Sequence, residues 1–129
     1  MELAKAVQLF AVIHLATLGL SHIVAHRAWA ELFILLRSHG RAGVFLVAFL
    51  SLGFGSVIAA FHSVWSGLPL VLTIYGWAQV AKGLLYLTFP SIGLKSLARV
   101  SVEGSRQFVI AGVALLLLAL FIGWVFIFN

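Results

Sequence analysis

The chain has 129 residues, of which 64% are hydrophobic and only 9% are charged. A soluble domain carries about 25% charged residues, so this composition indicates an integral membrane protein. The chain contains no cysteine, which excludes disulfides, thiolate metal ligands and cysteine nucleophiles.

Four stretches are long and apolar enough to cross a bilayer as helices. A hydrocarbon core of about 30 Å needs about 20 mainly apolar residues in a helix, because the backbone must satisfy its hydrogen bonds within the segment. A short uncharged turn from 62 to 67 separates the second and third stretches, and Pro90 ends the third. The predicted fold is therefore all-α, a four-helix transmembrane bundle that forms a single domain over residues 1–129. The expected spans are 7–24, 42–61, 68–89 and 107–128.

The two longer connections, 27–40 and 91–104, predict short amphipathic helices at the membrane surface, each with apolar side chains on one face. Basic helices of this kind lie among anionic lipid headgroups, which accounts for the net charge of +5 without nucleic acid. Opposite these connections only Lys5 is basic, and this bias predicts that the connections are cytoplasmic. We therefore expect a multi-pass protein of the bacterial inner membrane with both termini periplasmic or extracellular. The basic residues in and beside the connections are Arg27, Arg37, Arg41, Lys95, Arg99 and Arg106.

A lysine interrupts the third span, in the stretch YGWAQVAKGLLY (75–86). Residues spaced four, three and four apart share one helical face, so Lys82 belongs to a polar seam. A lysine near the bilayer centre costs about 2.5–3.5 kcal/mol. It either extends toward the headgroups or lines a hydrated pocket that binds an anionic or polar ligand. The seam consists of Tyr75, Gln79, Lys82 and Tyr86.

The first span carries a second polar line, formed by His14, Thr17 and Ser21. We expect Lys82 to point into the bundle toward this line and not toward lipid. Ser21 is the acceptor expected to match it in depth, and Glu31 is the acid best placed to reach it.

Small residues predict where helices approach each other closely. The second span carries such residues four positions apart, and two glycines of the third span flank the polar seam. The expected packing positions are Ser51, Gly55, Ala59, Gly76 and Gly83.

No metal or catalytic site is expected. His22 and His26 are spaced i, i+4 and could share an ion, but they lie where the first span leaves the bilayer, where histidines commonly serve as polar anchors. Histidines of different spans do not match in depth, which argues against a bis-histidine haem within one chain. A His14 that binds haem or a chlorin, or pairs across a dimer, stays open, and the cofactor is unknown. No cluster of serine, histidine and acid is visible, so an enzyme is not expected.

Two stretches, FHSVWSGLPLVLTIYGWAQVAKGLLYLTFP (61–90) and GLSHIVAHRAWAELF (19–33), resemble a family of small, four-span, uncharacterised bacterial inner-membrane proteins. In that family a His-x-x-Trp turn precedes a Gly-Trp…Lys-Gly span that ends at proline, and Arg-x-Trp follows the first span. This chain departs from the pattern at His26, where many members carry proline. The resemblance implies the four-span fold and brings no activity. It places His62, Trp65, Gly76, Trp77, Lys82 and Gly83 in the family pattern.

Two functions are compatible with these observations. Because so little of the chain lies outside the bilayer, helix faces are the main surface for partners. This favours a non-enzymatic protein that works by association, as a homo-oligomer or as an accessory subunit of a larger membrane complex. The alternative is a small oligomeric channel or transporter for a polar or anionic solute, lined by the polar seam.

Overall fold

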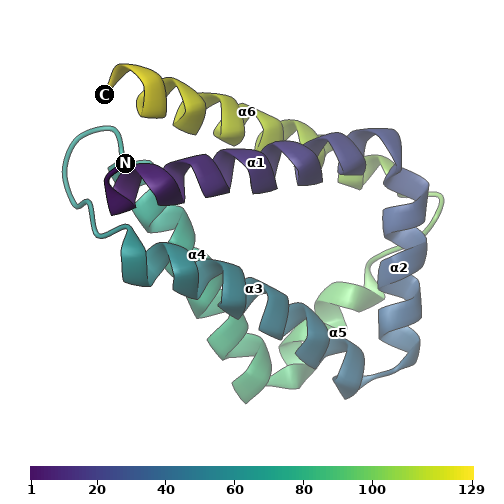
Figure 1. Ribbon diagram of the computed structural model, residues 1–129. Coiled ribbons are helices and arrows are strands. Elements are labelled where there is room, and N and C mark those ends of the chain that lie inside the picture. The colour runs from purple at the N-terminus through teal and green to yellow at the C-terminus, as the bar shows by residue number, and fades with distance from the viewer.

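The computed structural model describes residues 1–129 and contains six helices and no strands (Figure 1). Four of the helices are long and apolar enough to cross a membrane, so the expected all-α fold with four spanning and two short helices is confirmed. The first span begins at Leu3 and not at residue 7. Lys5 in its first turn donates to the carbonyl of Phe126 at 2.7 Å, which joins this turn to the last helix. The helices are α1 (Leu3–Val24), α2 (His26–Ser38), α3 (Arg41–Phe61), α4 (Leu70–Thr88), α5 (Pro90–Ala98) and α6 (Arg106–Phe128).

Local chemistry sets the sharp changes of direction between helices. Gly40 has a φ of 60° between α2 and α3, a conformation that residues with a Cβ rarely adopt. Pro90 occupies the first turn of α5, where its missing N–H costs no helical hydrogen bond. These two residues allow the short helices to turn away from the long ones.

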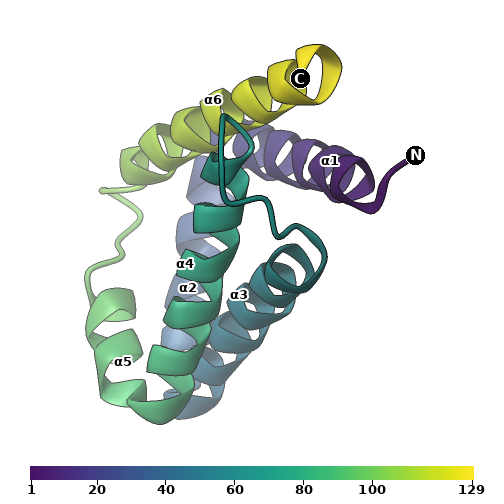
Figure 2. The ribbon, with the colours of Figure 1, turned by 90° about the vertical axis from the view of Figure 1, so that its left-hand side faces the viewer.

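The four long helices form two antiparallel pairs, α1 with α6 and α3 with α4 (Figure 1). The pairs meet at the end that holds both chain termini and the α3–α4 connection, which we call the terminal end. They diverge toward the opposite end, where α2 and α5 lie (Figures 1 and 2). We call this the basic end, because it carries the basic residues Arg27, Arg37, Arg41, Lys95, Arg99 and Arg106.

Glycines bring the backbones of each pair into contact. A Cβ at Gly19 would lie 2.8 Å from the carbonyl oxygen of Gly112, and a Cβ at Gly112 would lie 2.6 Å from that of Gly19. In the other pair, a Cβ at Gly55 would lie 2.7 Å from the carbonyl oxygen of Gly76. Neither crossing leaves room for a larger residue.

Two separate hydrophobic cores follow from this arrangement. The first lies at the terminal end, where all four long helices meet, and the second joins α2, α3 and α5 at the basic end. The first core contains Val7, Ala11, Leu15, Ile58, Leu72, Ala119 and Ile122. The second contains Leu36, Val44 and Leu97.

Candidate functional site

A cavity of about 190 Å³ lies at the basic end, beside the second core. Every helix except α1 contributes to its lining, which is mostly hydrophobic. We call it the Lys82 cavity, because Lys82 is the one charged residue of the lining. The lining residues are Phe33, Val44, Val47, Lys82, Tyr86, Gly93, Ser96, Leu97, Val100 and Phe108.

The ammonium group of Lys82 is available to a ligand. Its Nζ lies 5.7 Å from the centroid of the Tyr86 ring, a distance typical of a cation–π contact. The Lys82 side chain is exposed, whereas Tyr86 is half-buried against the second core. Glu31, the acid expected to reach Lys82, is exposed on α2 and does not line the cavity. The site therefore presents a cation without a carboxylate partner.

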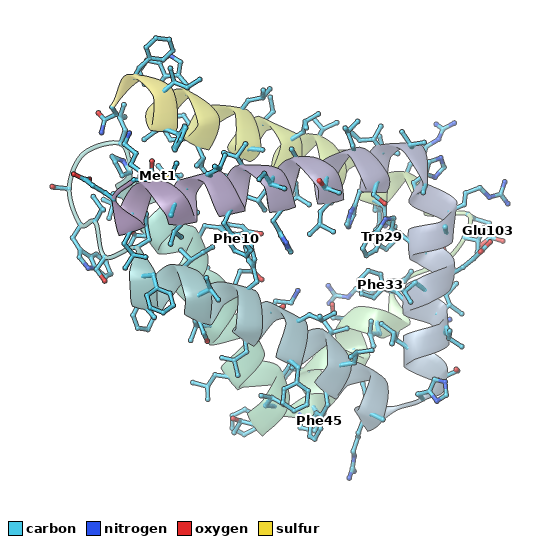
Figure 3. All side chains as sticks on the ribbon, in the orientation of Figure 1. Met1, Phe10, Trp29, Phe33, Phe45 and Glu103 are labelled. Carbon is cyan, nitrogen blue, oxygen red and sulfur yellow. The ribbon has the colours of Figure 1, made fainter.

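Two aromatic residues of the lining, Phe33 and Phe108, come from α2 and α6, and Trp29 lies one turn before Phe33 on α2. Trp29 and Phe33 point from α2 into the space between the helix pairs (Figure 3). The Trp29 indole donates to the Ser21 hydroxyl at 2.8 Å, and Phe33 stacks on Phe108 of α6 with ring centroids 5.4 Å apart. This hydrogen bond and this stacking fix α2 against the ends of α1 and α6.

Arg37 joins α2 to α5 through hydrogen bonds whose acceptors include two lining residues of the cavity, Leu97 and Val100. Its Nη1 donates to the carbonyls of Leu97, Ala98 and Val100, at 3.2, 3.3 and 2.9 Å. These carbonyls belong to the last turn of α5 and the residues after it, where a helix leaves acceptors without intrahelical partners. A cation there is also favoured by the helix dipole.

The polar seam of α4 does not line one continuous site. Lys82 and Tyr86 line the cavity, whereas Tyr75 packs edge-on against Phe54 beside the first core, at 6.1 Å. The Cβ of Gln79 lies against Gly55 of α3. The four residues share one helical face, but the helix pairs are closer together at one end of this face than at the other. Tyr75 and Gln79 therefore pack against neighbouring helices, whereas Lys82 and Tyr86 line the cavity.

The structure does not bring Lys82 to the polar line of α1, contrary to our expectation. His14 stacks on the Phe54 ring at 4.1 Å, Thr17 is exposed, and the Ser21 hydroxyl accepts the indole hydrogen bond described above. The reason is the pairing of the helices. Because α1 packs along α6, it has already diverged from α4 at the depth of Lys82.

The small residues of α3 and α4 lie between these two helices. Ser51, Gly55, Gly76 and Gly83 are buried there. Ala59 is half-buried, and its backbone nitrogen lies 3.4 Å from where a Cβ of Gly76 would stand. This face is therefore used within the chain and is not available to a partner.

A buried network of polar side chains lies at the terminal end, and the sequence did not predict it. His62 follows α3 and is fully buried. Its Nδ1 lies 3.0 Å from the Thr73 hydroxyl, which donates to the carbonyl of Val64 at 2.8 Å. Its Nε2 lies 3.0 Å from the amide nitrogen of Gln8. The network therefore joins α1, the end of α3 and α4.

The partners of His62 determine its protonation. Because the Thr73 hydroxyl uses its proton on a carbonyl, His62 donates through Nδ1 and accepts the Gln8 amide at Nε2, which is a neutral imidazole. Burial lowers the pKa of His62, and a backbone hydrogen bond offsets part of this effect. The His-x-x-Trp turn drew attention to His62, but nothing in the sequence pointed to Gln8 or Thr73 as its partners.

His22 and His26 do not share a site. The Nδ1 of His22 lies 2.7 Å from the carbonyl of Leu18, and its ring stacks on Trp29. The Nδ1 of His26 lies 2.8 Å from the hydroxyl of Ser105. No group of three or more histidines, cysteines and acids is arranged to hold a metal ion.

Comparison with known proteins adds no relative. No family model, no curated protein and no solved structure matches this chain. The resemblance in the motifs therefore stays a prediction. Among its residues, His62, Gly76 and Gly83 are buried, whereas Trp65, Trp77 and Lys82 are exposed.

Proposed function

We propose that this chain is a non-enzymatic protein of the bacterial inner membrane that binds an amphipathic anion, such as a long-chain carboxylate, in the Lys82 cavity. One observation carries the proposal. An unpaired ammonium stands at the edge of an apolar cavity between two diverging helix pairs. A negatively charged group on an apolar chain complements both parts of this site.

The energetics of the membrane support an anionic ligand. Placing a lysine in a spanning helix costs about 2.5–3.5 kcal/mol, and such residues are commonly found at functional sites. The cation–π contact with Tyr86 offsets part of this cost, at about 0.5–1 kcal/mol for an exposed pair. An anion bound beside Lys82 supplies the remaining partner.

The size of the cavity limits which part of the ligand it holds. Sites for drug-sized molecules span about 300–1,000 Å³, and the Lys82 cavity has about 190 Å³. It therefore accommodates a small headgroup and the first carbons of a chain. The rest of the chain lies outside this volume.

Thermal unfolding in phosphatidylcholine nanodiscs tests the proposal. Oleate should raise the unfolding midpoint of the wild-type chain, because a ligand that binds only the folded state stabilises it by mass action. Oleyl alcohol has the same chain without the charge and should have a smaller effect. In Lys82→Met, oleate affinity should fall about fivefold, since an exposed ion pair contributes up to about 1 kcal/mol.

Lys95→Met is the matched control, because Lys95 is exposed on α5 and does not line the cavity. It should bind oleate as the wild type does. Equal stabilisation by oleate and oleyl alcohol, or equal losses in the two variants, would overturn the proposal.

Association with another chain is the second candidate. The outward face of α3 carries Gly53, Ser56 and Ala60, all exposed, and a Cβ at Gly53 would meet nothing within 4 Å. Small residues at this spacing allow close helix contact. A homo-oligomer or an accessory subunit would use this face. Native mass spectrometry of the wild type and of Gly53→Leu tests this candidate. An assembly that forms in the wild type and is lost in the variant supports it, whereas a strictly monomeric wild type opposes it.

The channel alternative has less support. Because Tyr75 and Gln79 pack within the chain, the seam offers no continuous polar path along α4.

A further inference from the structure

A second hollow lies at the corner where α1 passes into α2 and beside the start of α6. It has a volume of about 240 Å³, and one of its six lining residues is hydrophobic. Figure 3 places Glu103 on the outer side of α2, away from the space between the helix pairs. We call this hollow the corner groove. Its lining residues are His26, Arg27, Val102, Glu103, Ser105 and Arg106.

The floor of the corner groove is held in place by a hydrogen bond between helices. The Nδ1 of His26 lies 2.8 Å from the hydroxyl of Ser105, which is only 4% exposed. This bond ties the first residue of α2 to the residue before α6. Arg27 and Arg106 lie in the first turns of these helices, so their attachment points have fixed positions relative to each other.

Three charged groups of the groove are free to contact a ligand. The side chains of Arg27, Arg106 and Glu103 are exposed, and the bond between His26 and Ser105 uses none of them. Their combination is specific, because two guanidinium groups stand with one carboxylate around the same hollow. A simple anion would be opposed by the carboxylate, whereas a ligand with a negative and a positive group would satisfy all three.

The position of the groove indicates where its ligand comes from. α1 ends at Val24 and α6 begins at Arg106, so the groove lies where two spanning helices leave the bilayer. This is the depth of lipid headgroups, where arginines commonly contact phosphate.

We propose that the corner groove binds the headgroup of a phospholipid that carries a phosphate beside an ammonium group, as in phosphatidylethanolamine. Arg27 and Arg106 donate to the phosphate oxygens, because the guanidinium fork matches phosphate geometry. Glu103 accepts hydrogen bonds from the ammonium. A choline headgroup has no N–H to donate, and a glycerol headgroup has no positive charge to offset the carboxylate.

Native mass spectrometry of the detergent-solubilised chain tests this proposal. The probes are phosphatidylethanolamine, phosphatidylglycerol and phosphatidylcholine with identical acyl chains. The wild type should retain phosphatidylethanolamine in preference to the other two. In the double variant Arg27→Gln/Arg106→Gln, affinity for this lipid should fall about fivefold for each arginine. In Glu103→Gln, the preference over phosphatidylglycerol should disappear while lipid binding persists.

The control is the double variant Arg41→Gln/Arg99→Gln, which removes the same charge from exposed positions outside the groove. It should retain the lipid as the wild type does. Equal losses in the two double variants, or equal retention of the three lipids by the wild type, would overturn the proposal. Displacement of the lipid by an equal concentration of soluble O-phosphoethanolamine would overturn the assignment to a lipid. Lys82→Met should leave this preference unchanged, which separates the groove from the Lys82 cavity.

Discussion

His62 joins three helices through one imidazole ring at the joint between the helix pairs. Its ring is fully buried, and both nitrogens have polar partners from other parts of the chain. A buried polar group that loses its partner costs about 1–3 kcal/mol. The side chain therefore stabilises the joint only while it stays neutral and its partners remain in place.

This neutrality predicts that stability decreases in acid. Burial lowers the pKa of His62 in the folded state below the value of about 6.5 for an unperturbed histidine. Below pH 6.5 the unfolded chain therefore binds a proton that the folded chain does not. The stability that His62 contributes is present above about pH 6.5 and is lost as the pH falls through the folded-state pKa. The thermal unfolding midpoint in detergent should be lower at pH 5 than at pH 7.5.

His62→Gln keeps a polar side chain that does not titrate in this range, so its unfolding midpoint should depend less on pH. His39→Gln removes an exposed histidine at the end of α2 and should keep the pH dependence of the wild type. If the unfolding midpoints of the two variants change equally with pH, His62 is not the group that makes stability depend on pH.

Which residues of the candidate site share a helical face could be predicted from the sequence, but what that face contacts could not. Helical periodicity placed Tyr75, Gln79, Lys82 and Tyr86 on one face, as they are. What that face contacts depends on which helices pair, and nothing in the span of α1 distinguishes a partner in α4 from one in α6. The expected contact between Lys82 and Ser21 failed for this reason.

At the scale of helices, the crossing of α1 with α6 depends on two glycines. Gly112→Ala should destabilise the chain by about 1–3 kcal/mol, the usual cost of overpacking a close contact. The added Cβ would lie 2.6 Å from the Gly19 carbonyl oxygen, and backbone cannot move aside as a flexible side chain can. Thermal unfolding in detergent measures the effect.

Gly53→Ala is the matched control, because a Cβ at Gly53 meets nothing within 4 Å. Both substitutions add one methyl group to a glycine inside a spanning helix. A Gly112→Ala variant as stable as Gly53→Ala would mean that the crossing tolerates the extra atom.

The attachment of α5 makes a second prediction at this scale. In Arg37→Met, the carbonyls at the end of α5 lose their guanidinium donor, so the last turn of this helix should open more readily. A cation at a helix C-terminus contributes about 0.3–1 kcal/mol. Hydrogen exchange should therefore accelerate about two- to fivefold at the amides of residues 97–100. Arg41→Met removes an exposed arginine of α3 and should leave these amides unchanged. Equal exchange at these amides in both variants would show that the Arg37 guanidinium does not stabilise the end of α5.

Helices were easier to predict from the sequence than their pairing. Apolar runs of about 20 residues and Pro90 mark where the spanning helices lie and where α4 ends. The run that forms α6 is apolar on every side, so its sequence carries no sign of the face that meets α1. Gly19 and Gly112 lie in different spans, and only the folded structure shows that they cross.

At the scale of the whole molecule, the two cores and the space between them explain the shape. The first core holds the helix pairs together at the terminal end, and the second holds α2 and α5 across the basic end. Between these fixed ends the pairs diverge (Figure 1). The Lys82 cavity lies at the basic end, where Val44 and Leu97 of the second core form part of its lining, so its walls depend on how α2 and α5 are held there.

The orientation of the molecule in the membrane is the last prediction. Both termini and the α3–α4 connection lie at one end, and the basic residues gather at the other (Figure 1). Arginine and lysine near the ends of spans are retained on the cytoplasmic side, so the basic end should face the cytoplasm.

The chain has no cysteine, so a single introduced cysteine is the only thiol that a maleimide can label. In intact spheroplasts, a membrane-impermeant maleimide should label Ser66→Cys in the α3–α4 connection. It should label Ser101→Cys, between α5 and α6, only after the membrane is permeabilised. Both serines are exposed, so the difference reports the side of the membrane and not burial. Labelling of Ser101→Cys but not Ser66→Cys in intact spheroplasts would invert the orientation and place the Lys82 cavity toward the outer leaflet.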